Sequence, residues 1–271
     1  MSNAATKVGP NLLEPARTYQ SSVVAPAKDF IFGNVVEVNP LGTNGRVCSF
    51  NCPYCDLSQS FLTMNEIRKK LEFPKVQDIG TELRHVLTHW KSTWPTPTAI
   101  IVSGNGEPTL HPQIDHLMEE IRTLRDELRP SLPINLYTNA AQLATNKVAR
   151  ATQIADEKLI KIDAGNDTTL KIINAPLVRM GLNKTINAIR KIKDVSIQSI
   201  FISGTLSNLE DKQIDDWIEV LGMIGPKKIY LQTTRFQPQD NRVVPATEDQ
   251  LHLVAQKVER RTGLRPLVFT R

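Results

Sequence analysis

All three cysteines of the chain, Cys48, Cys52 and Cys55, lie in one short segment. Three residues separate the first pair and two separate the second, so a curled loop can bring three thiolates toward one point. A [4Fe–4S] cluster normally takes four cysteines, and with three of them one iron keeps a position for an exogenous ligand. Structural zinc would need a fourth protein ligand, and the nearest histidines, His85 and His89, lie on a predicted helix. The spacing therefore favours an iron–sulfur site over a zinc site.

A second group of candidate residues follows a buried strand about fifty residues later and comprises Gly104, Asn105, Gly106 and Glu107. Glycine at a strand end lets the backbone approach a ligand closely. A carboxylate beside it can accept charge-assisted hydrogen bonds from an ammonium group. Taken alone, such a turn most often precedes a helix, but next to a cysteine loop it predicts a cofactor site.

Three later strand ends carry polar side chains that suit ligand binding. Asn139 follows one strand and Asp163 the next, and a short acid can accept hydrogen bonds from vicinal hydroxyls, with an Asx turn as the alternative. Gln232 and Arg235 follow another strand, where the guanidinium could clamp a substrate carboxylate or phosphate or could simply be exposed.

Apolar segments alternate with helical patterns along most of the chain, which predicts βα units and a parallel sheet. Right-handed crossovers repeated in this way curl the sheet into a barrel or a partial barrel, with ligands at the carboxyl ends of the strands. We expect strands at residues 34–38, 99–102, 134–137, 159–162, 195–202, 228–232 and 266–269. We expect helices at residues 56–71, 76–92, 112–129, 143–155, 168–173, 181–192, 210–224 and 248–261.

Length and composition fit one soluble α/β domain, since 271 residues do not force a second one. We expect residues 1–28 to form an extended, proline-punctuated arm and residues 29–271 to form the domain. No apolar run is long enough for a membrane span, and clustered cysteines favour a reducing compartment, so we expect a cytoplasmic protein. The net charge of +5 comes with scattered basic clusters, interpreted as solvated helix faces rather than an RNA-binding surface.

These motifs together resemble the radical S-adenosylmethionine (SAM) superfamily, whose hallmark is the C-x3-C-x2-C spacing with an aromatic residue, here Tyr54, before the last cysteine. The resemblance implies an α/β fold of the partial (β/α)6 TIM-barrel type and SAM as the ligand of the open iron. It also implies that Tyr54 lies beside the adenine and that Gly106 and Glu107 match the family's Gly-Gly-Glu motif, which binds the methionyl amino group. Asn139 and Asp163 would reach the ribose or the carboxylate of SAM.

Motifs at residues 106–112, 137–139, 162–165 and 173–176 look like those of wyosine-synthase-like iron–sulfur oxidoreductases, a poorly characterised group. Wyosine synthases themselves carry cysteines for a second cluster, which this chain lacks, so the resemblance implies a single-cluster enzyme that abstracts hydrogen from an unidentified substrate. A small molecule is favoured over tRNA or protein, with a flavodoxin or ferredoxin as the electron donor. The alternatives are a glycyl-radical activating enzyme, a tRNA-base-modifying enzyme, and a non-enzymatic zinc- or RNA-binding module.

Overall fold

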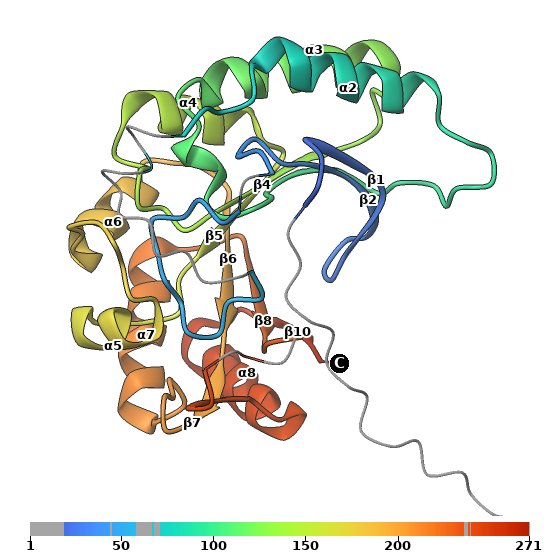
Figure 1. Cartoon of the computed structure of the whole chain (residues 1–271). Coiled ribbons are helices and arrows are strands. Elements are labelled where there is room, and N and C mark those ends of the chain that lie inside the picture. Colours follow the sequence, from blue (N-terminus) through green and yellow to red (C-terminus); the bar gives the residue numbers. More distant parts are fainter. Residues whose placement is uncertain are drawn as a thin grey trace, which may run out of the picture.

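A computed structural model describes residues 19–43, 45–57, 67, 71–235, 238 and 240–270. Its main feature is a curled sheet in the order β1-β2-β3-β4-β5-β6-β8-β10, in which neighbours from β2 onward are parallel and β1 is antiparallel (Figure 1). The strands are β1 (Val23–Asp29), β2 (Gly33–Val38), β3 (Ile100–Val102), β4 (Ile134–Thr138), β5 (Glu157–Lys161), β6 (Val195–Ile200), β7 (Ile202–Gly204), β8 (Lys228–Gln232), β9 (Val243–Pro245) and β10 (Leu267–Phe269). Strands β7 and β9 form a separate antiparallel pair.

Helices connect the parallel strands and cover the convex side of the sheet (Figure 1). They are α2 (Val76–Thr88), the 3₁₀ helix η1 (Pro108–Leu110), α3 (Ile114–Leu128), α4 (Asn146–Ile154), α5 (Asp167–Ile173), α6 (Leu182–Ile189), α7 (Asp211–Ile224) and α8 (Glu248–Thr262). Because each crossover returns to the next strand along, the sheet curls progressively. The partial barrel expected from the sequence is confirmed, with β10 as a further parallel strand beside β8.

The hydrophobic core lies between the sheet and its helices. In α2, Ile79, Leu83 and Leu87 recur at helical spacing and are buried against one face of the sheet. Strand residues alternate, so those that do not enter this core point to the opposite, concave side. There strands β2 and β4, on either side of β3, present polar side chains, Glu37 and Tyr137, to a cavity. The concave side thus combines this polar lining with a smaller apolar cluster that includes Val35 and Ile101.

Two expectations about local structure need correction. Residues 23–28 of the expected arm form, together with Asp29, strand β1, which pairs with β2 and shifts in register between Val24 and Ala27 at Pro26. Proline, which lacks an N–H, is tolerated at such an irregularity on an edge strand. The strand expected at 195–202 is divided, because β6 pairs with β8 up to Ile200 and the chain from Ile202 onward pairs with β9 as β7.

The helix expected at residues 56–71 lies almost wholly outside the described residues, as does most of the expected arm, and the boundary between arm and domain stays a prediction. Within the part of the chain that the structure describes, no helix has the length and apolar character needed to cross a bilayer.

Candidate active site

The cysteine loop follows β2 and is attached to the turn after β3. The N–H of Val47 donates to Asn105 O at 2.8 Å, and the N–H of Glu107 donates to Val47 O at 2.9 Å. Gly106 lies between these two bonds with φ of 139°, and a Cβ at this position would come within 2.0 Å of Val47 O. Only glycine fits such a close approach of two backbones. The turn expected to bind SAM and the loop expected to bind the cluster are therefore one structure.

All three cysteines line a single cavity at the carboxyl ends of the strands. Cys52 is buried, whereas Cys48 and Cys55 are partly exposed, and all three are free thiols. Among the described residues no group of three or more His, Cys, Asp or Glu side chains is arranged as it stands to hold one ion. A cluster, however, spreads its protein ligands over several irons, and three thiols around one cavity are a donor set of that chemistry. The residues present fit an iron–sulfur cluster on this ground.

A buried cation, Arg46, accompanies the cysteines and was not singled out from the sequence. Burial raises the pKa of Cys48 to about 12 and that of Cys55 to about 11, while Arg46 opposes both shifts. Burial lowers the pKa of Arg46, but the charges of Cys55, Cys48 and Cys52 outweigh it and raise that pKa overall. The Arg46 side chain donates to Phe50 O and Asn51 Oδ1, and its Nε lacks a partner in the structure. Arg46 thus favours the thiolate form that iron requires.

Glu107 is 2% exposed and lines the same cavity. Its Oε1 accepts hydrogen bonds from Thr138 Oγ1 at 2.7 Å and from Thr109 N at 3.1 Å, and its Oε2 accepts from Asn139 N at 2.6 Å. Burial raises the pKa of Glu107, and the hydrogen bonds that it accepts partly reverse this shift. These hydrogen-bond donors are all neutral, and Oε2 accepts fewer hydrogen bonds than Oε1, so the carboxylate retains capacity to accept from a cation in the cavity.

The two residues before Gly106 differ in their placement. Gly104 lines the cavity with φ of 100°, and a Cβ there would come within 2.3 Å of Asn39 Oδ1. Asn105 is fully buried and does not line the cavity. Its Nδ2 donates to Tyr19 O and Gly42 O at 3.0 and 2.8 Å, and its Oδ1 accepts from Tyr19 N. The Asn105 side chain therefore secures the neighbouring backbone and does not face a ligand.

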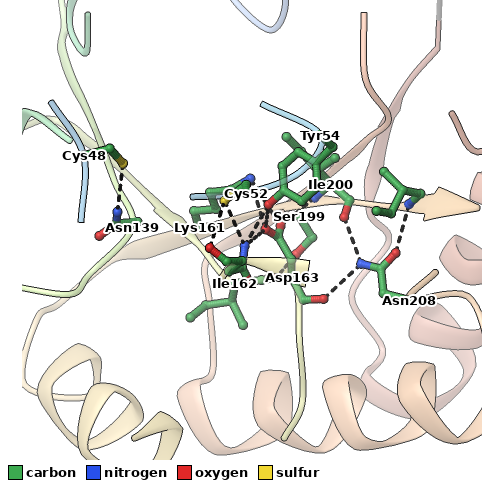
Figure 2. Close-up of polar contacts among 12 residues, drawn as sticks. Cys48, Cys52, Tyr54, Asn139, Lys161, Ile162, Asp163, Ser199, Ile200 and Asn208 are labelled. Atoms are coloured by element: carbon green, nitrogen blue, oxygen red, sulfur yellow. Dashed lines mark hydrogen bonds and ion pairs between the residues drawn. The ribbon is translucent and has the colours of Figure 1, made fainter. Parts of the chain in front are cut away.

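Asn139 joins the carboxylate turn to the first cysteine. Its Nδ2 lies 3.7 Å from Cys48 Sγ (Figure 2). The same nitrogen donates to Ser49 Oγ at 2.9 Å, and the backbone N–H of Asn139 donates to Glu107. Its Oδ1 also accepts from Ala141 N at 3.0 Å. Asn139 lines the cavity, so its place beside both parts of the expected cofactor site agrees with a binding role that stays a prediction.

Asp163 occupies a different environment from the one expected. Its side chain is fully buried behind Tyr54, whose hydroxyl donates to Asp163 Oδ2, and it does not line the cavity (Figure 2). Lys161 forms an ion pair with Oδ2 at 3.1 Å, and the N–H of Ile200 donates to Oδ1 at 2.8 Å. Asn174 Nδ2 donates to Oδ2 at 2.6 Å. The expected contact with ribose hydroxyls stays untested, but the observed partners assign Asp163 to positioning Tyr54.

Tyr54 itself lines the cavity and is held from two sides. Lys161 Nζ lies 4.9 Å from the centre of its ring, and Asn174 Nδ2 donates to its hydroxyl at 2.7 Å. The same amide nitrogen lies 3.6 Å from Cys52 Sγ. Asn174, which sequence reasoning did not propose as a site residue, therefore connects the second cysteine with the Tyr54–Asp163 pair. The resemblance named its segment, 173–176, and that was the one available signal.

The same cavity contains the two residues expected to bind substrate. Gln232 is 6% exposed at the end of β8, and Arg235 is exposed with its guanidinium 5.1 Å from the centre of the Phe30 ring. Both line the cavity, where Asp29 and Glu37 also lie. Of the twelve residues predicted from the sequence, ten therefore line one cavity, and Asn105 and Asp163 do not.

The family model of the radical SAM superfamily matches residues 45–221. This range contains the cysteine loop, the Glu107 turn and the strands between β3 and β6. The chain belongs to the radical SAM superfamily. Members are enzymes that use SAM and an iron–sulfur cluster and need an external source of electrons, and the match supports the reductive cleavage of SAM by this chain.

Three curated relatives illustrate the range of similarity. A UPF0026 protein of Synechocystis sp. is 26% identical over 223 residues, which cover 80% of this chain and 77% of that protein. A Brachyspira hyodysenteriae protein named GTPase Obg is 26% identical over 231 residues, which cover 82% of this chain. The chain spans 32% of the length of that Brachyspira protein, and 52% of a UPF0026 protein of Helicobacter pylori.

Solved structures show the same fold at low sequence identity. TYW1 with a bound lysine-pyruvate adduct has a TM-score of 0.59 and 14% identity, covering 84% of this chain and 73% of that one. A radical SAM methyltransferase from Sphaerobacter thermophilus has a TM-score of 0.61 and 16% identity, covering 87% and 65% of the two chains. Streptococcus suis SuiB bound to SAM has a TM-score of 0.58 and 12% identity, covering 83% and 48%.

Proposed function

We propose that the chain holds a single [4Fe–4S] cluster through Cys48, Cys52 and Cys55 and cleaves SAM to abstract a hydrogen atom from a small molecule. Bound together, the cluster and SAM supply one-electron cleavage of the sulfonium and a 5′-deoxyadenosyl radical that removes hydrogen from the substrate. One observation carries the proposal: the three thiols and the Glu107 carboxylate line one cavity, and the Val47–Gly106 contact fixes their loops to each other.

The protein's part in this reaction is to orient SAM and to keep water away. Glu107 would accept hydrogen bonds from the ammonium of SAM, since its present partners are neutral donors. The glycines Gly104 and Gly106 let the backbone approach the same group. Tyr54 would pack beside the adenine, held in place by Asp163. Asn139, next to both Cys48 and Glu107, would orient the methionyl end of SAM.

The substrate would bind in the part of the cavity that Gln232 and Arg235 line. Gln232 ends β8 and Arg235 follows it, and Asp29 and Glu37, on β1 and β2, line the same cavity. Hydrogen-bond donors and acceptors of both charges in one partly enclosed cavity suit a polar small molecule. Arg235 can hold a carboxylate or phosphate through two parallel hydrogen bonds. The chain corresponds to only part of the length of its Brachyspira and Helicobacter relatives. The small-molecule substrate is therefore proposed for this chain alone.

The test is anaerobic reconstitution with iron and sulfide, followed by SAM cleavage with dithionite. We expect a brown protein that forms 5′-deoxyadenosine, with EPR of the reduced sample typical of a [4Fe–4S]⁺ cluster. Cys52→Ala should lose both the cluster and 5′-deoxyadenosine formation. Thr43→Ala, an exposed residue that precedes the cysteines, should keep both. A colourless protein that retains zinc after anaerobic purification, or an intact cluster without SAM cleavage, would contradict the proposal.

A further inference from the structure

The cysteine loop is clamped from behind by the segment between α5 and α6. The N–H of Asn51 donates to Asn174 O and Ala175 O at 3.2 and 3.0 Å, and the N–H of Leu177 donates to Ser49 O at 2.8 Å. Phe50 and Pro176 form an isolated antiparallel bridge. The residues between the first two cysteines are therefore in direct backbone contact with residues 174–177, which continue to the protein surface.

A surface pocket lies on this clamp, and its lining includes Asn51 of the cysteine loop as well as Leu177 and Arg179. Two of the large apolar side chains that the structure leaves exposed belong to this region, Leu177 at 39% and Ile172 at 44%. Exposed apolar side chains beside a pocket are typical of a surface that a partner protein covers. The pocket is separate from the cavity of the expected cofactors and opens next to the same loop.

Positive charge is concentrated on the same part of the chain. Residues 167–194 contain six Lys and Arg and two Asp, a surplus of four positive charges in a chain whose net charge is +5. Lys171, Arg179 and Lys184 are exposed, on α5, on the clamp and on α6, which lie on one flank of the sheet (Figure 1). The remaining three basic residues of this segment, Arg190, Lys191 and Lys193, are exposed between α6 and β6, at the opposite, amino ends of the strands. Around the pocket, whose lining also includes Asp167, the cations are in excess, and such a surface attracts an acidic partner and accelerates its association.

We propose that this face docks an acidic one-electron carrier protein, which delivers its electron to the cluster through Ser49–Asn51. We call it the donor face and define it as Lys171, Ile172, Leu177, Arg179 and Lys184. The proposal rests on the proposed function, since it assumes a cluster at the three cysteines. In each encounter the carrier is oxidised by one electron and the cluster is reduced by one electron. The rate of electron tunnelling falls exponentially with distance. Electron transfer is therefore fastest when the carrier docks where only one loop separates it from the cysteines.

The donor face is basic, so the partner should be acidic. An apolar patch on the partner would contact Ile172 and Leu177. A basic rim around an apolar centre is the complement of a small redox protein with an acidic rim around its exposed prosthetic group. Nucleic acid is the other polyanion that such a surface could attract. The test therefore includes tRNA as a competing ligand.

The experiment compares a protein reductant with a chemical one on the reconstituted full chain. The double variant Lys171→Glu/Arg179→Glu should slow reduction of the cluster by photoreduced flavodoxin about tenfold or more at low salt. The rate is measured in a stopped-flow instrument as the loss of cluster absorbance. Reduction by dithionite, and SAM cleavage driven by it, should stay at the wild-type rate. The matched control is Lys227→Glu/Arg265→Glu, two exposed residues that precede β8 and β10 at the opposite ends of the strands. This control should leave both rates unchanged.

Two outcomes would overturn the inference. The first is an unchanged rate with flavodoxin in Lys171→Glu/Arg179→Glu; if the same variant also shows weakened, salt-dependent binding of tRNA, the face binds nucleic acid instead. The second is an equal loss of rate with dithionite, which would indicate damage to the cluster loop. The proposed function fails separately, if the wild-type protein with an intact cluster does not cleave SAM even with dithionite.

Discussion

Glu107 and Asp163 are both buried carboxylates that follow strands of the same sheet, but their partners differ in kind. Glu107 accepts hydrogen bonds from the hydroxyl of Thr138 and from backbone N–H groups, and it faces the cavity. Asp163 is paired with the ammonium of Lys161, accepts from Tyr54, and does not face the cavity. One carboxylate can therefore still take a cation, and the other already has one.

This difference shows that position at a strand end does not decide what a side chain does. A buried carboxylate with its own cation and a full set of donors stabilises the structure around it. A buried carboxylate held by neutral donors beside a cavity is prepared for a charged ligand at the cost of its own desolvation. Substitutions at the two sites should thus be separable, one acting on folding and the other on binding.

The largest effect is expected from Asp163→Ala. This change leaves half-buried Lys161 without its counter-charge and Tyr54 and Asn174 without their acceptor. We expect the free energy of unfolding to fall by about 3 to 5 kcal/mol. Urea denaturation of the metal-free protein, followed by circular dichroism, measures it. Glu127→Ala, which breaks the exposed pair with Arg84, is the control and should change little. If Asp163→Ala is as stable as the wild type, Asp163 does not stabilise the fold and does not differ from Glu107 in this respect.

The next effect concerns Glu107→Gln, which removes the charge but keeps the shape. Hydrogen bonds to charged groups contribute about 1.5 to 3 kcal/mol, so SAM should bind about 10- to 100-fold more weakly. Anaerobic equilibrium dialysis of the reconstituted protein gives the Kd. Glu157→Gln is a matched control, because that carboxylate is paired with Lys228 at the amino end of β5. Equal Kd values for Glu107→Gln and the wild type would mean that the carboxylate does not bind the ammonium.

A smaller effect is expected from Thr138→Val, which removes one neutral donor to Glu107. A neutral hydrogen bond contributes about 1 kcal/mol, so the Kd for SAM should rise about fivefold. Thr138→Ser keeps the hydroxyl and should behave as the wild type. If the serine variant binds SAM as weakly as the valine variant, the methyl group rather than the hydrogen bond is responsible.

The smallest effect tests a third carboxylate in the same cavity, Glu37. Burial raises its pKa above the ordinary value of 4.5, and the nearby charges of Asp29 and Asp56 add to the shift. The folded state thus binds this proton more tightly than the unfolded state does, which stabilises the fold below about pH 4.5. That contribution is lost as the pH rises through the folded-state value. Relative to Glu37→Gln, the wild type should become less stable between pH 4 and 8, measured by urea denaturation. Parallel stability curves would contradict this assignment.

Much of the site was predictable because its residues are close together in sequence. The spacing of Cys48, Cys52 and Cys55 and the composition of residues 104–107 are local signals, and the strand before each places it at the carboxyl edge of a parallel sheet. The curled sheet was predictable for a similar reason, since apolar strands alternate with helices of matching periodicity. The cavity then follows from the direction of the strands.

The remaining contacts depend on pairs far apart in the chain. Tyr54 and Asp163 are 109 positions apart, and Cys52 and Asn174 are 122 apart, so no local pattern joins them. Strand β1 was not predicted because Pro26 interrupts its sequence. In the structure the register shifts at this proline, and pairing with β2 resumes at Ala27. Whether a carboxylate at a strand end already has a cation and a full set of hydrogen-bond donors therefore depends on tertiary packing.

The close approach of Gly106 to Val47 implies thermodynamic linkage between the two cofactors. Hydrogen bonds run in both directions between these segments, so the ligands of iron and the carboxylate for the ammonium share one rigid backbone junction. Whatever orders one loop orders the other, and the conformational entropy lost on binding the first cofactor need not be lost again for the second. By reciprocity, SAM should tighten the binding of the cluster by the same coupling free energy with which the cluster tightens the binding of SAM. Cluster retention and SAM affinity should accordingly behave as one heterotropic, cooperative equilibrium.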